Sequence, residues 1–71
     1  MTLILSNALV NTEHFHSIYM ENDNLILEGI STVVISGVPS DALSKIAVAT
    51  AESKSFVEFE NAELMLTEVE G

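Results

Sequence analysis

The chain has 71 residues, a formal net charge of −9 and no cysteine. This length predicts one small domain, and the lack of Cys excludes disulfides and thiolate chemistry. Eleven acidic residues against two lysines disfavour contact with nucleic-acid phosphates or an anionic membrane surface, and they favour a protein partner with a basic surface.

The first ten residues are uncharged. Residues 2–5, TLIL, predict a strand, and Ser6-Asn7 predicts a turn or an irregularity before residues 8–10, ALV. Whether the strand continues to residue 10 stays open. The segment lacks the basic start of a secretory signal, and no uncharged apolar run reaches the ~18 residues that a membrane helix needs. These features favour a cytoplasmic protein without a membrane segment.

His14 and His16 are two residues apart and so share one face of a strand. Two imidazoles can take part in a zinc site, but such a site needs three or four ligands, and the further ligands would have to be remote glutamates. The pattern therefore favours ordinary polar strand residues. Neither a metal site nor a functional role is assigned to these histidines.

Residues 16–29 predict a β-hairpin closed by Asn22-Asp23, because both turn residues tolerate left-handed backbone. The turn sets Met20 opposite Leu25 and Tyr19 opposite Ile26. Alternation then places Ile18, Met20, Leu25 and Leu27 on one face. Since the other face is apolar too, it predicts a homo-oligomer or partner contact formed by Phe15, Tyr19, Ile26 and Ile30.

Residues 31–36, STVVIS, predict a β-branched strand that ends before Pro39. A helix is expected over about residues 40–52, with Ser40 as its cap and Asp41 in its first turn, where the helix dipole favours an anion. Apolar and small residues then recur at helical spacing and predict a stripe that faces the core, formed by Leu43, Ile46, Ala47 and Thr50.

Residues 55–60, SFVEFE, alternate as in a strand with one wet face, so Val57 and Phe59 share the opposite face. Residues 61–70 fit either a further strand or one or two helical turns, and the short length without a cap favours the strand. The carboxylates of this region have two interpretations: they shield an edge strand from unwanted pairing, or they form a docking surface for a basic partner made of Glu58, Glu60, Glu63, Glu68 and Glu70.

These elements predict a single α+β domain over residues 1–71, with a small, mostly antiparallel sheet of four to six strands and one helix packed on one face. No pattern is typical of a nucleophile, an acid–base pair or a phosphate-binding loop, so no catalytic residue and no cofactor are assigned. The leading hypothesis is a non-catalytic, acidic protein-protein interaction module that acts as an inhibitor of a basic, nucleic-acid-handling protein. The alternative is a self-assembling structural or small-ligand-binding module, and an enzyme ranks third.

Overall fold

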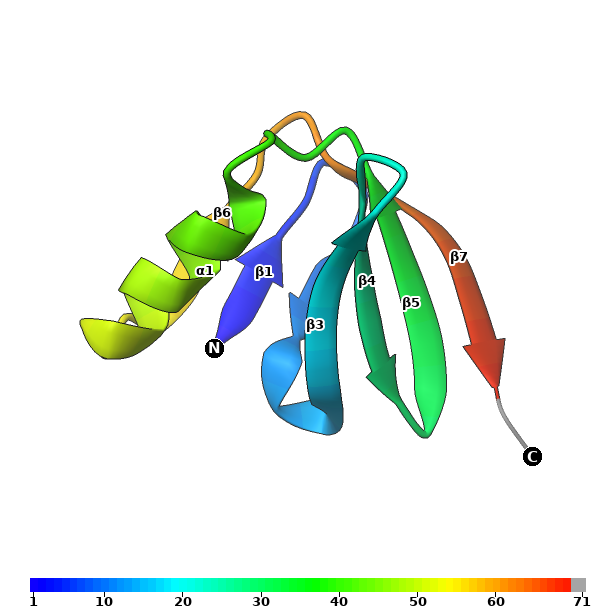
Figure 1. Cartoon of the computed structure of the whole chain (residues 1–71), viewed down its shortest axis with the longest axis horizontal. Helices are drawn as coiled ribbons and strands as arrows, with labels where there is room; N and C mark the ends of the chain where they lie inside the picture. The colour runs from blue at the N-terminus through cyan, green and yellow to red at the C-terminus, as the bar shows by residue number, and fades with distance from the viewer. Residues whose placement is uncertain (70–71) are drawn as a thin grey trace.

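The computed structural model describes the backbone of residues 1–69 and the side chains of residues 1–65. Within them the chain forms a three-stranded sheet of order β2-β1-β6 and a four-stranded sheet of order β3-β4-β5-β7 (Figure 1). One α-helix, α1 (Ala42–Ala51), precedes β6, and a 3-10 turn, η1 (Thr12–His14), precedes β3. The strands are β1 (Thr2–Ile4), β2 (Leu9–Asn11), β3 (Phe15–Glu21), β4 (Asn24–Gly29), β5 (Ser31–Ser36), β6 (Phe56–Glu58) and β7 (Glu63–Val69).

The predicted α+β class with a mostly antiparallel sheet and one helix is confirmed. The described residues contain seven strands rather than four to six. The seventh strand is β2, because residues 9–11 are separate from the strand predicted at residues 2–5. The single sheet predicted is wrong: residues 2–4, 9–11 and 56–58 form a second sheet, in which β1 pairs antiparallel with β2 and parallel with β6. Figure 1 shows α1 beside β1 and β6 at one side of the molecule, and β3, β4, β5 and β7 at the other.

The predicted hairpin is confirmed residue by residue. Tyr19 lies opposite Ile26 and Met20 opposite Leu25, with Asn22 at φ 52° and Asp23 at φ 66°. Left-handed backbone at both central residues is the geometry of a two-residue hairpin turn whose twist matches the flanking strands. The turn chemistry therefore determines the register of the β3–β4 pair.

Phe15 does not lie on the face predicted for it. A bulge between Phe15 and Ser17 shifts the register by one residue, so Phe15 lies opposite Gly29 and packs against the core. A one-residue shift moves a side chain to the other face of a strand. Gly29 permits this close approach, because a Cβ there would lie 2.5 Å from the His14 carbonyl oxygen.

The two sheets are joined at the turn between β1 and β2, where a turn was predicted. Ser6 Oγ donates to the Ala62 carbonyl oxygen at 2.8 Å, and Asn7 Oδ1 accepts from the Leu64 N–H at 2.8 Å. These bonds hold the start of β7 next to the end of β1. The preference for a strand over a helical turn is thereby confirmed for Glu63–Val69.

The core lies between the two sheets and α1. Its fully buried large side chains come from both sheets: Leu3, Leu25, Leu27 and Ile35. The face predicted from the hairpin to hold Leu25 and Leu27 therefore is the core face. Phe59, just after β6, is also buried in this cluster.

The helix is confirmed, but the stripe predicted to face the core is only partly right. Ile46 is buried, together with Ala42 and Ala49, whereas Leu43, Ala47 and Thr50 are exposed. Small residues face the sheets, because they let the helix axis approach closely. No helix within residues 1–69 has the length and apolar composition needed to cross a bilayer.

The predicted cap at Ser40 is wrong. The helix begins after Asp41, whose side chain makes no capping hydrogen bond, and the Ala42 N–H donates to the Pro39 carbonyl oxygen at 3.0 Å. A backbone turn at Pro39 therefore supplies a partner that a Ser side chain would otherwise provide.

Candidate functional site

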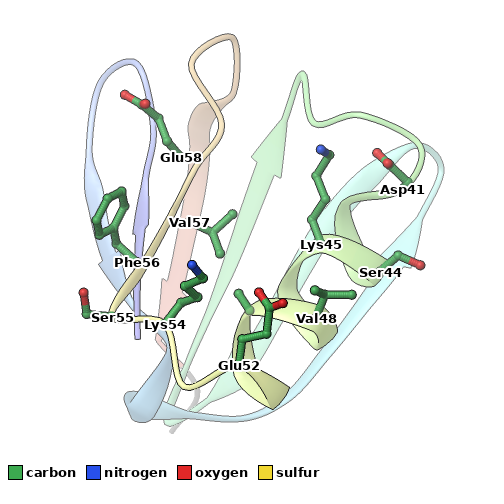
Figure 2. Close-up of a pocket in the computed structure, with 11 residues that line it drawn as sticks. Asp41, Ser44, Lys45, Val48, Glu52, Lys54, Ser55, Phe56, Val57 and Glu58 are labelled. Atoms are coloured by element: carbon green, nitrogen blue, oxygen red, sulfur yellow. The ribbon is translucent and has the colours of Figure 1, made fainter.

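A groove of about 620 Å³ lies between α1 and β6 (Figure 2). The helix contributes Lys45 and Val48 to it, the connection that follows contributes Lys54, and the strand contributes Phe56 and Val57. The parallel pairing of β1 with β6 places the strand beside the helix that precedes it. Figure 2 shows Val57 on the side of the strand that faces α1 and Phe56 on the opposite side.

Both lysines of the chain line this groove, in a protein with eleven acidic residues. Within the described residues, neither Lys45 nor Lys54 has a carboxylate within salt-bridge distance; the ion pair that forms joins the amino terminus to Glu13 at 3.8 Å. Asp41, Glu52 and Glu58 also line the groove. The groove therefore offers two unpaired cations among acids, next to exposed apolar surface.

Three of the glutamates predicted to bind a partner are exposed on the segment that links the two sheets. Glu58 ends β6, Glu60 lies in the following turn and Glu63 begins β7. Glu58 and Glu60 together line a smaller groove of about 330 Å³, which Lys45 also borders. The structure thus places Glu58 and Glu60 on one groove, and Glu63 farther along the chain at the start of β7.

The side chains of the remaining two predicted glutamates, Glu68 and Glu70, lie outside the described residues. Glu68 lies in β7, where its backbone is opposite Thr32, but its side chain lies outside the described residues. Glu70 lies outside them altogether. Their part in a docking surface stays a prediction.

The four apolar residues predicted from the hairpin to form one contact surface lie in different environments in the structure. Phe15 joins the core, Ile26 is only 8% exposed, and Tyr19 is half-buried on the outer face of the four-stranded sheet. Ile30, between β4 and β5, is 83% exposed. Of the four residues, Ile30 has by far the most surface to offer a partner.

His14 and His16 are both exposed, and His16 Nδ1 lies 3.2 Å from Ser17 Oγ. In the part of the chain that the structure describes, no group of three or more His, Asp or Glu side chains is placed to hold a metal ion. The prediction that the two histidines share one face of a strand is wrong: His14 ends η1, and only His16 lies in β3, where it is the extra residue of the bulge.

Sequence reasoning missed the groove. The two lysines are nine positions apart in sequence, and only one of them lies on the helix. They line one groove because β6 lies next to α1, in a sheet formed by the pairing of residues 2–4 with residues 56–58. No local pattern signals a parallel pair so distant in sequence.

None of the protein-family models, curated proteins and solved structures compared with this chain matches it.

Proposed function

We propose that this protein is a non-catalytic module that binds a protein partner with a basic surface. A partner that uses the same surface to hold nucleic acid would be inhibited by the complex. The observation that carries the proposal is the exposure of Glu58, Glu60 and Glu63 on one short segment, without a lysine in salt-bridge contact within the described residues.

Unpaired, exposed carboxylates support such a role because their charge is not neutralised inside the chain. The net charge of −9 attracts a basic surface over a long range and speeds the encounter. On contact, lysine or arginine side chains of the partner gain charge-assisted hydrogen bonds to carboxylates that still have free acceptor sites.

The test compares two variants that remove the same number of charges. One replaces Glu58, Glu60 and Glu63 with Gln, and the other replaces Glu13 and Glu21 with Gln and Asp23 with Asn. Affinity capture from the native host followed by mass spectrometry supplies candidate partners, and each purified candidate is then titrated at low and at physiological salt.

The first variant is expected to bind the partner at least about tenfold more weakly at low salt, and the second less than about threefold more weakly. The wild-type affinity should itself fall as salt rises, because exposed charges are screened beyond about 8 Å at 0.15 M. Equal losses of affinity in the two variants would mean that the net charge of the protein, rather than these three glutamates, determines binding. If neither variant loses affinity, the glutamates do not bind the partner, and their role is to shield an edge strand from unwanted pairing.

A second candidate function, self-assembly, is favoured by Ile30. An isoleucine that is 83% exposed at the connection between β4 and β5 offers apolar surface to a second copy. Light scattering coupled to size exclusion tests it: we expect a dimer or larger species at micromolar concentration that becomes monomeric in Ile30→Glu with the circular dichroism retained. A mass near the monomer value of 7.7 kDa across a dilution series would contradict self-assembly.

A further inference from the structure

The edge of the three-stranded sheet at β6 has free backbone groups. The Thr2 N–H donates to the Ser55 carbonyl oxygen at 3.0 Å, and the Phe59 N–H donates to the Ile4 carbonyl oxygen at 2.9 Å. In a parallel pair this pattern turns the backbone of Val57 toward β1 and the N–H and C=O groups of Phe56 and Glu58 away from it. Since β6 is the last strand in the order β2-β1-β6, these groups point to an open edge.

The groove described above lies along this edge. Helix α1 forms its other wall, so an extended chain placed beside β6 would have a strand on one side and a helix on the other (Figure 2). Val48 on the helix and Phe56 on the strand are each 55% exposed. An edge strand next to exposed apolar side chains is the arrangement by which domains add a peptide as a further strand.

The charge of the groove indicates what such a peptide carries. Lys45 and Lys54, the two basic side chains of the whole chain, are both here and both without a salt-bridge partner in the described region. A carboxylate that reaches either ammonium group gains an ion pair and displaces none. Asp41, Glu52 and Glu58 disfavour a continuous run of acids, so the carboxylates must be spaced by uncharged residues.

We propose that the groove between α1 and β6 binds an extended segment of a partner protein in which acidic and apolar residues alternate. The segment adds as a strand to the open edge of β6. Alternation turns its acidic side chains toward α1, near Lys45 and Lys54, and its apolar side chains toward the exposed ring of Phe56. This site differs from the proposed docking surface for a basic partner, because it uses the lysines and the backbone edge rather than the charge of Glu60 and Glu63, although Glu58 borders both.

The experiment uses a capped hexapeptide of alternating Glu and Val, added to the isotopically labelled full chain and followed by amide chemical shifts. Matched hexapeptides replace Glu with Gln or with Lys. A fourth peptide keeps the Glu-Val sequence but carries N-methyl groups on alternate residues, which removes its backbone donors on one edge.

The Glu-Val peptide is expected to bind most tightly and to shift the amides of residues 54–58 and of the helix face that carries Lys45 and Val48. N-methylation should abolish binding, since strand addition depends on the backbone ladder. Lys45→Gln and Lys54→Gln should each weaken binding about threefold and together about tenfold, and Lys→Arg at both positions should restore it, as expected for exposed ion pairs.

Three results would overturn the proposal. These are tighter binding of the Lys-Val peptide, shifts confined to the edges at β3 or β7, and no saturable binding of any peptide at millimolar concentration. Because both lysines are exposed, the Gln variants should keep the circular dichroism spectrum and the melting temperature of the wild type. The basic-partner titration with Glu58, Glu60 and Glu63 variants is a separate measurement, so the failure of one proposal leaves the other unaffected.

Discussion

Tyr19 and Glu28 form a side-chain pair across neighbouring strands on the outer face of the four-stranded sheet. Tyr19 lies opposite Ile26, so Glu28 is its diagonal neighbour, and the phenol O–H donates to Glu28 Oε2 at 3.1 Å. The hydrogen bond to Glu28, followed by desolvation and by the charges of Glu28 and Glu21, raises the pKa of Tyr19 above 10.0. Ionisation would lose the hydrogen bond and bring a third negative charge to this place.

The chain has one Tyr and no Trp, so this pKa can be measured directly by the ultraviolet absorbance of tyrosinate. We expect a titration midpoint above 10.0 that moves back toward 10.0 in Glu28→Gln, because the variant removes the charge. Glu13→Gln is the control and should leave the midpoint unchanged. A wild-type midpoint at or below 10.0 would contradict the hydrogen bond.

The same shift has a consequence for stability. Since the folded pKa lies above the unfolded value, the protonated phenol stabilises the folded state. That contribution is fully present below the unfolded pKa and is lost as pH rises through the raised folded pKa. The ionisation of Tyr19 therefore does not contribute to the pH dependence of stability near neutrality.

At the scale of single elements, sequence patterns predicted the features that residues close together in the sequence determine, namely the hairpin and the helix. The register of the β3–β4 hairpin follows from Asn22-Asp23, and the helix follows from a run of good helix formers after Pro39. The split into two sheets was not predictable in this way, because β6 finds β1 across more than fifty residues. The position of Phe15 was missed because a bulge inverts strand alternation without a clear sequence signal.

The buried face of α1 gives an element-scale prediction. Ile46 is 7% exposed and Leu43 is 38% exposed, although the periodicity assigned both to the core. Ile46→Ala should lower the free energy of unfolding by about 2–4 kcal/mol, because it leaves a cavity where α1 packs on the core. Leu43→Ala should cost about 1 kcal/mol, less than Ile46→Ala, since the side chain of Leu43 keeps more than a third of its surface in contact with water.

Urea denaturation of both variants measures these costs, and the two side chains are close enough in size for a direct comparison. A larger loss in Leu43→Ala than in Ile46→Ala would mean that the helix is rotated so that the stripe predicted from the sequence faces the core. Equal losses would mean that both side chains are packed, as in a helix buried on two sides.

At the scale of the whole molecule, composition predicted an acidic exterior but not where its two lysines lie. The expectation that Glu58, Glu60 and Glu63 face solvent follows from strand alternation, and all three are exposed. The convergence of Lys45 and Lys54 on one groove is a property of tertiary packing. The net charge counted from the sequence therefore describes the electrostatic field of the whole molecule, but it does not locate the two lysines.

The unbalanced charge also predicts how stability responds to salt. With a net charge of −9 and no lysine–carboxylate ion pair in the described residues, the folded state gathers repelling acids at closer range than the unfolded chain does. Raising NaCl from about 10 mM to about 150 mM shortens the screening length from about 30 Å to about 8 Å. Stability should then rise by on the order of 1 kcal/mol, which is about 4–8 °C in melting temperature for a domain of this size.

Differential scanning calorimetry at a series of NaCl and KCl concentrations measures this rise. The two salts should act alike, because screening depends on ionic strength and not on the identity of the monovalent cation. The variant with Gln at positions 58, 60 and 63 should melt at a higher temperature than the wild type in low salt and gain less from added salt, since part of the repulsion is already removed. A melting temperature that falls as salt is added would mean instead that attractive ion pairs dominate the folded state, and the field of this molecule would then be more balanced than its composition implies.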